Sequence, residues 1–264
     1  MGSRTVSLSI SGVNEALKRR VLELQNYALL SARALTNLLT GPRYVGDLLI
    51  QMDIVGVGSL PIVVLTGFFI GAVLVLQTAS QFERFGQTAL TGDVVAIALV
   101  RELGPTITAL LVAGRNASGM ASELGSMVVT EQVDAMRAMG TDPTRKLVTP
   151  RVVATLIVLP LLTVIADFVG LIGGFVVSHF ELQLNPVQYW TRAIDALELG
   201  DIVQGLTKPV IFAYILSTIG CYFGLTVRGG TQGVGRATTE AVVFSSVFIL
   251  VVNFFLTRLL LWLF

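Results

Sequence analysis

The sequence predicts an all-α integral membrane protein with an N-terminal amphipathic helix, five transmembrane helices and a long polar segment between the second and third spans. Over 264 residues the mean hydropathy is +0.78. Only 13% of the residues are charged, which is about half the proportion typical of soluble domains. Five apolar stretches each approach the ~20 residues that a helix needs to cross a bilayer. These stretches lie at residues 54–80, 92–113, 150–178, 204–227 and 240–262.

Residues 11–40 are predicted to form an interfacial helix. Apolar residues recur at steps of three, four and seven from Leu17 to Leu38, and polar residues follow the same period on another face. Gly41 and Pro42 are placed to end this helix. Its polar residues are too frequent for a membrane span, so we expect it to lie in the plane of the interface. The alternative is a soluble helix packed on a cytosolic partner. Three basic residues near its start suit anionic headgroups: Lys18, Arg19 and Arg20.

The distribution of basic residues predicts the orientation. With a cytoplasmic N-terminus, 13 of the 18 lysine and arginine residues fall on the inner side of the membrane. Five spans then place the C-terminus outside.

Several kinds of chemistry are excluded by composition. A single cysteine, Cys221, and a single histidine, His179, leave no disulfide framework, cysteine cluster or histidine cluster for a metal. A net charge of +1 gives no indication of a nucleic-acid partner. The glycine-rich stretch 228–239 lacks the lysine of a nucleotide-binding loop and is interpreted as a flexible hairpin between spans. We therefore predict no metal, no cofactor and no catalytic residue in this chain, and no cleavable signal peptide.

The segment 114–149 is too polar to span and carries its own helix signals. Gly140 is placed to end a helix in a left-handed conformation, Asp142 to cap the next helix and Pro143 to occupy its first turn. A connection that only returned to the membrane would need a few residues. We therefore expect a structured cytosolic platform on which a partner docks.

Charged residues inside the spans are the other anomaly. Arg101 and Glu102 lie within the second span and Lys208 near the start of the fourth, and each costs about 2.5–3.5 kcal/mol at the centre of a lone helix. Gly104-Pro105 follows the first two and predicts a kink. If all three are ionised they carry a net charge of +1, which favours a niche for a lipid phosphate. The alternative is a structural network in which Glu102 pairs with Arg101 or Lys208. Asp167, in the third span, is more simply interpreted as a buried hydrogen-bonding group.

Several motifs of the platform and the spans resemble those of MlaE-type (YrbE-like) ABC permeases, the membrane subunits of bacterial phospholipid transporters that use MCE proteins. The resemblance covers essentially the whole chain, as one permease domain over residues 1–264. The motifs are Ala113-Gly114-Arg115, Ser122-Glu123-Leu124-Gly125-Ser126-Met127, Thr130-Glu131-Gln132-Val133-Asp134-Ala135, Met139-Gly140-Thr141-Asp142-Pro143, Arg101-Glu102-Leu103-Gly104-Pro105 and Gly235-Arg236-Ala237-Thr238-Thr239.

The resemblance implies a homodimer in the bacterial inner membrane that maintains outer-membrane lipid asymmetry. A separate ABC ATPase subunit would bind ATP and Mg, a STAS-domain protein would bind that ATPase, and a hexameric MCE protein would sit on the periplasmic face. A coupling helix at about 122–139 would dock on the ATPase, and phospholipid would occupy a cavity at the dimer interface. The residues implied in ATPase coupling are Glu123, Glu131, Asp134 and Arg137.

The end of the first span is implied to line the lipid site, although ordinary packing against a neighbouring span would also explain its pattern. The residues concerned are Leu74, Gln77, Thr78, Gln81 and Phe85, to which the charges Arg101, Glu102 and Lys208 are added. Two other functions stay open: a membrane anchor for a cytosolic complex, which would not need the three charges, and an ion-coupled transporter, which would need no ATPase.

Overall fold

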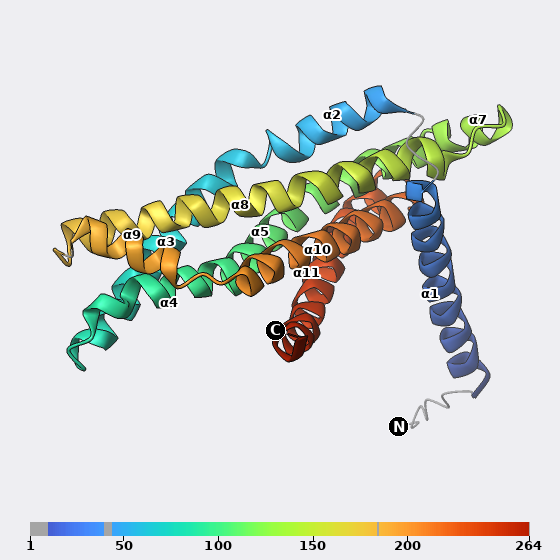
Figure 1. Ribbon diagram of the computed structural model, residues 1–264. Helices are drawn as coiled ribbons and strands as arrows, with labels where there is room; N and C mark the ends of the chain where they lie inside the picture. The colour runs from blue at the N-terminus through green and yellow to red at the C-terminus, as the bar shows by residue number, and fades with distance from the viewer. Residues whose placement is uncertain (1–9, 40–43, 184, 264) are drawn as a thin grey trace, which may run out of the picture.

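The computed structural model describes residues 10–39, 44–183 and 185–263, and in these ranges it contains helices and turns but no strand. Figure 1 shows a long bundle in which α3 and α10 run beside α8, while α1 extends away from one end of the bundle at a steep angle. Within these ranges, five helical segments are long and apolar enough to cross a membrane. The predicted fold class is confirmed. The segments are Val45–Glu83, Thr91–Val129, Thr144–Phe180, Leu199–Leu225 and Gly230–Leu263.

Most of these segments are built from several helical pieces. The first consists of α2 (Val45–Gly56) and α3 (Leu60–Glu83). After the short η1 (Thr88–Leu90), the second is a continuous rod of α4 (Thr91–Ala98), η2 (Leu99–Leu103), α5 (Gly104–Val112), η3 (Ala113–Ala117) and α6 (Ser118–Val129). The third is η4 (Thr144–Val148) with α8 (Thr149–Phe180). The remaining helices are α1 (Ile10–Leu39), α7 (Gln132–Ala138), α9 (Pro186–Asp195), α10 (Leu199–Leu225) and α11 (Gly230–Leu263).

The segments are longer than a bilayer is thick. At 1.5 Å per residue, the 39 residues of Thr91–Val129 extend about 58 Å, against about 30 Å of hydrocarbon. These helical segments therefore project beyond the membrane. Residues that were predicted to belong to loops form the ends of helices instead.

Close backbone contact joins α3 to α8. A methyl group added at Gly71 would lie 1.8 Å from the Gly170 carbonyl oxygen, and one at Gly173 would lie 2.1 Å from the Phe68 carbonyl oxygen. Small residues let two helices approach this closely in a membrane. Because the backbones interlock, α3 and α8 form one rigid pair.

The break between α2 and α3 is held by a polar cluster from η3. Arg115 Nη1 donates to the Ile54 carbonyl oxygen over 2.8 Å and to Ser59 Oγ over 3.3 Å, and Asn116 Nδ2 also donates to Ser59 Oγ over 3.3 Å. The guanidinium thus satisfies a carbonyl at the end of α2 that has lost its helical partner.

Helix α1 confirms the helix predicted at 11–40, although its predicted end at residues 40–42 lies outside the described residues. It is attached to α10 by hydroxyl contacts: Tyr27 lies 3.1 Å from Thr218, and Ser31 lies 2.5 Å from Tyr214. Burial raises the pKa of Tyr27, so its phenol stays a neutral hydrogen-bonding group. The position of α1 in the plane of the membrane stays a prediction.

The interpretation of the stretch 228–239 as a flexible hairpin is wrong. Helix α10 ends at Leu225 and α11 begins at Gly230, so the connection is limited to residues 226–229, with positive φ at Gly229 and at Gly230, the first residue of α11. Helix α10 begins at Leu199, five residues before the predicted span 204–227, because Glu198 and Asp201 form a reciprocal capping box at its start.

Candidate functional site

An open hollow of about 500 Å³ lies on the exposed side of α3. This volume is within the range of about 300–1,000 Å³ found for small-molecule pockets. Two polar residues, Thr66 and Gln77, interrupt an otherwise apolar lining, which suits a hydrocarbon chain better than a polar ligand. The lining residues are Leu65, Thr66, Phe69, Ile70, Val73, Leu74, Gln77 and Leu103. We call this hollow the α3 groove.

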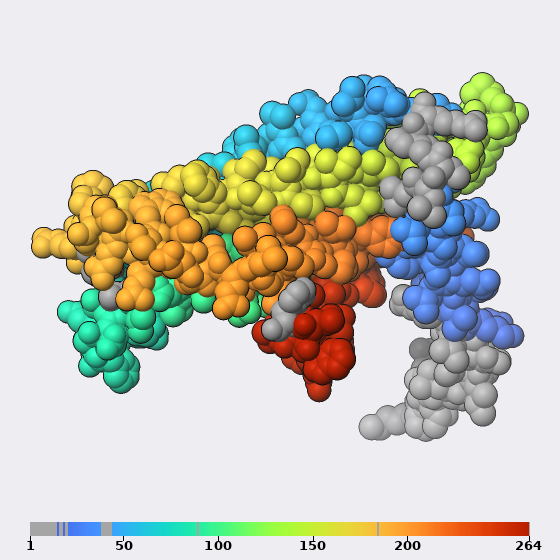
Figure 2. Space-filling view, in the orientation of Figure 1, coloured from blue at the N-terminus to red at the C-terminus, as the bar shows by residue number. Residues whose placement is uncertain are grey.

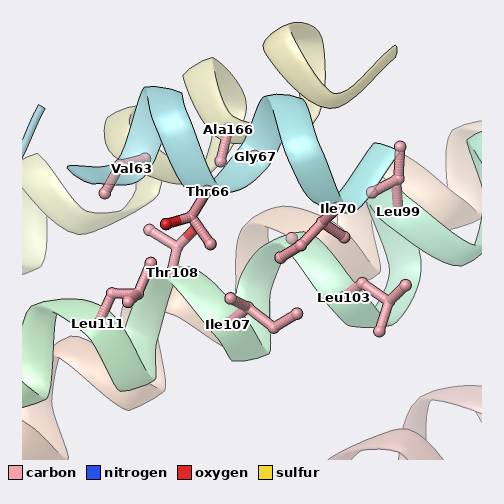
Figure 3. A pocket seen from close by; sticks show the side chains of 11 residues that line it. Val63, Thr66, Gly67, Ile70, Leu99, Leu103, Ile107, Thr108, Leu111 and Ala166 are labelled. Carbon is pink, nitrogen blue, oxygen red and sulfur yellow. The ribbon is translucent and has the colours of Figure 1, made fainter. Parts of the chain in front are cut away.

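A narrow crevice continues the α3 groove between α3 and α5 (Figure 3). The two share Thr66, Ile70 and Leu103. In the close-up, Thr66 and Thr108 lie next to each other across the crevice, with Ile107 and Leu111 along the α5 side. Seven of the eight residues that line the groove therefore lie on α3 and the eighth, Leu103, lies on η2, whereas α5 lines the crevice.

The structure brings only part of the predicted lipid-lining set to this groove. Leu74 and Gln77 line it, as does Leu103 next to the predicted charges. Thr78, Gln81 and Phe85 do not line it, because they lie further along α3 or beyond its end at Glu83. A role of these residues in lipid binding stays a prediction.

Lys208 is the centre of a polar cluster behind the groove. It is fully buried, and its Nζ donates to Glu102 Oε1 over 2.6 Å, to the Arg101 carbonyl oxygen over 2.7 Å and to Thr257 Oγ1 over 2.9 Å. Thr257 in turn donates to Glu102 Oε1 over 2.9 Å, and Asn253 Nδ2 donates to Glu102 Oε2 over 3.3 Å. The three ammonium protons are all used within the protein.

Arg101 forms an ion pair with Asp201 at the start of α10. Its side chain is one-third exposed, whereas that of Asp201 is 5% exposed. With Asp201 included, the cluster holds two positive and two negative charges. Asp201, which lies between the predicted third and fourth spans, therefore balances the surplus of +1 expected from the three charges.

This arrangement separates the three predicted charges. Glu102 and Lys208 form the structural network that was the alternative interpretation, and a lipid phosphate would find no unused donor on Lys208. Lys208 is fully buried, whereas the side chains of Arg101 and Glu102 are 33% and 37% exposed, so Arg101 is the basic residue able to turn guanidinium protons toward a ligand.

The π-helical turn η2 presents these side chains. It spans Leu99–Leu103 and immediately precedes Gly104-Pro105, where an irregularity was predicted. A π turn widens the helix and is frequent at functional sites. Here it turns Glu102 toward α10 and α11 while Leu103 lines the groove.

Asp167 packs against this irregular turn. A methyl group added at Gly104 would lie 1.6 Å from its Oδ1, and that oxygen is buried without a hydrogen-bond partner among the described residues. The hydrogen bond predicted for Asp167 is therefore not found at Oδ1.

Three further residues of the cluster were not predicted as site residues: Asp201, Asn253 and Thr257. Glu198 and Asp201 have the spacing of a capping box, which is a sequence signal for a helix start. This signal could have placed the start of the fourth helix at residue 199, and so Asp201 in the same helix as Lys208. Asn253 and Thr257 are spaced four residues apart in the last apolar run, which puts both on one helix face.

The predicted coupling helix at about 122–139 is two helices. Helix α6 ends at Val129, Glu131 adopts a left-handed conformation with φ of 60°, and α7 follows. A left-handed residue cannot continue an α-helix. Gly140 has the predicted positive φ, 75°, and Asp142 Oδ1 accepts from the Thr144 backbone N–H over 2.9 Å, as its capping role requires.

The four residues implied in ATPase coupling are all exposed, and three of them lie at the turn and on α7. Glu131 lies in the turn, and Arg137 donates to Asp134 over 2.7 Å on α7. Figure 2 shows α7 projecting at the end of the molecule opposite α9. Glu123 differs, because its Oε2 accepts from Arg151 Nη2 over 2.8 Å.

Comparison with known proteins gives consistent matches. A family model described as Permease MlaE matches residues 48–259, a range that contains both the groove and the platform. A probable ABC transporter permease protein of Rickettsia typhi is 44% identical over 234 residues, covering 89% of this chain and 90% of the relative. The chloroplastic protein TRIGALACTOSYLDIACYLGLYCEROL 1 of Arabidopsis thaliana is 37% identical over 87% of this chain and 65% of the relative. The intermembrane phospholipid transport system permease protein MlaE of Haemophilus influenzae is 36% identical over 80% of this chain and 81% of the relative.

Proposed function

The chain belongs to the MlaE permease family, and from that premise we propose that it is the membrane subunit of an ATP-driven transporter that carries phospholipid between the inner and outer membranes. In this role it maintains the lipid asymmetry of the outer membrane. ATP and Mg are bound by a separate ATPase subunit.

The observation that carries the proposal is the apolar α3 groove, which Leu103 of η2 helps to line. Arg101 lies two residues before Leu103 on another face of the same turn, where it is partly exposed and paired with Asp201. The apolar walls suit acyl chains, and a guanidinium suits a phosphate because it can donate two parallel hydrogen bonds.

The platform supports the ATP-driven part of the proposal. Helix α7 lies at the end of the bundle opposite α9, and its charged residues are exposed. We propose that Glu131, Asp134 and Arg137 contact the ATPase. With the N-terminus cytoplasmic and the C-terminus periplasmic, this end faces the cytosol.

Further partners follow from the same family resemblance. We propose a homodimer whose interface encloses the lipid cavity, a STAS-domain protein on the ATPase and a hexameric MCE protein on the periplasmic face. The exposed apolar faces of α3 and α11 would face lipid or the second copy; they include Phe69, Val247, Phe248, Phe254 and Phe255.

Purification of the complex from native membranes, with a photocrosslinker at Leu74 or Gln77, tests the proposal. We expect an ATPase at an abundance comparable to that of the permease, and phospholipid crosslinked at both positions. Crosslinks to protein alone at both positions would favour ordinary packing of α3. Recovery of the permease without any ATPase would favour the membrane anchor or the ion-coupled transporter.

A further inference from the structure

Arg151 is a buried charge whose partner comes from the cytosolic platform. Its side chain is 7% exposed at the start of α8, and Nη2 donates to Glu123 Oε2 of α6 over 2.8 Å. Nη1 donates to the Leu147 carbonyl oxygen over 2.8 Å. A buried arginine requires a counter-charge, and Glu123 supplies it although its own side chain is 48% exposed.

The two helices joined by this ion pair lead to opposite walls of the α3 groove. Helix α6 is the inner end of the rod that contains η2 and α5, and Leu103 of that rod lines the groove. Helix α8 is interlocked with α3, and α3 supplies Leu74 and Gln77 to the facing wall.

The two walls respond differently to a displacement at the cytosolic end. A shift of α8 carries α3 with it, because Gly71 and Gly173 leave no space for the backbones to slide past one another. The rod of α4 to α6 is interrupted by the π turns η2 and η3, which are frequent at functional sites. Along α8, about 33 Å separates Arg151 from Gly173 at 1.5 Å per residue.

We propose that the Glu123–Arg151 ion pair is the positioning contact that passes movement of the cytosolic platform to the α3–α8 wall of the groove. Glu123 thus acts within the permease and does not bind the ATPase. This inference rests on the proposed function, because it assumes an ATPase that moves the platform.

The ion pair also ties the platform to α10. Helix α10 packs on η3 and α6 through glycines. A methyl group at Gly224 would lie 2.7 Å from Leu124 Cβ of α6, and one at Gly220 would lie 3.0 Å from the Cα of Ala117 in η3. The pair therefore adds a polar contact between the tightly packed α6–α10 unit and the interlocked α3–α8 unit, which also meet where α10 packs on α8. Its loss removes this contact at the platform end and leaves the packing of α10 on α8 in place.

The test measures phospholipid transported per ATP hydrolysed by the complete complex in lipid nanodiscs or liposomes. We expect Glu123→Gln to lower this ratio at least fivefold while the ATPase still co-purifies at the wild-type ratio and still hydrolyses ATP. Arg151→Met should have the same effect. Exchange of the two charges, Glu123→Arg with Arg151→Glu, should recover at least half of the wild-type ratio.

Arg192→Gln is the matched control, because it removes an arginine–carboxylate pair with Asp93, 3.7 Å apart, between α9 and α4 at the opposite end. It should leave the ratio unchanged. Glu123→Gln is isosteric and half exposed, so it keeps the test informative if the charge exchange fails to fold.

The inference is overturned if folded Glu123→Gln and Arg151→Met complexes keep the wild-type ratio, or if Glu123→Gln releases the ATPase, which would make Glu123 a direct contact. The inference is also overturned if transport and ATP hydrolysis fall by the same factor and that factor equals the loss of folded protein. A wild-type complex without ATP-dependent transport would instead contradict the proposed function itself.

Discussion

Replacing Glu102 by glutamine should destabilise the permease by about 3 kcal/mol, because it removes the counter-charge of a fully buried lysine. Lys208 is 0% exposed and donates to Glu102 over 2.6 Å. Breaking a buried ion pair by removing one partner costs about 3–5 kcal/mol. We expect the lower end because Glu102 is 37% exposed and because Lys208 keeps two acceptors, the Arg101 carbonyl oxygen and Thr257.

A double-mutant cycle in nanodiscs isolates this interaction. The variants are Glu102→Gln, Lys208→Met and the two together, each followed by thermal unfolding and by lipid content per folded complex. The double variant should lie within about 1 kcal/mol of wild type, since it leaves no unpaired buried charge. The reasoning is refuted if Glu102→Gln costs less than about 1 kcal/mol, or if the cost of the double variant equals the sum of the single costs.

Further substitutions separate the lipid site, the platform and the packing. Arg101→Gln should lower co-purified phospholipid several-fold while the complex still assembles; unchanged lipid in the assembled complex would place the headgroup elsewhere. Charge reversal of Glu131 and Asp134 together should abolish lipid-stimulated ATP hydrolysis with the permease still folded, and unchanged ATPase binding and activity would remove their coupling role. Gly71→Val should prevent the contact of α3 with α8 and abolish folded protein in size-exclusion chromatography, since even a methyl group would approach the α8 backbone to 1.8 Å. A photocrosslinker at Gln77 should capture phospholipid in cells, and capture of protein alone would argue for packing.

The fold class was predictable because it follows from properties that are summed over long stretches. Five apolar runs in a chain with 13% charged residues have few solutions other than membrane helices. The ends of the spans were less predictable, because single residues decide them. Glu198 with Asp201 starts α10 five residues early, and left-handed Glu131 divides the platform helix.

Part of the site was predictable for a similar reason. Charges in a membrane need partners, so Arg101, Glu102 and Lys208 could be grouped before their contacts were known. The grouping could not say which pairs form, since that depends on the register between helices distant in the sequence. The register brings Asp201 to Arg101 and leaves Lys208 to Glu102.

One residue implied in ATPase coupling has a charged partner within the chain. Glu123 belongs to a motif implied to meet the ATPase, yet its carboxylate is held by Arg151 of the same chain. Sequence spacing could not reveal this ion pair, because the partners are 28 positions apart and α7 with its flanking turns lies between them.

The most direct test of the account is the movement of labelled phospholipid between liposomes and an acceptor by the purified complex, with ATP, with a non-hydrolysable analogue and with an ion gradient alone. The account predicts movement with ATP only, and its loss when the ATPase subunit is omitted. Movement driven by the ion gradient without ATP, or no ATP-dependent movement by a complex that binds both ATPase and lipid, would contradict it.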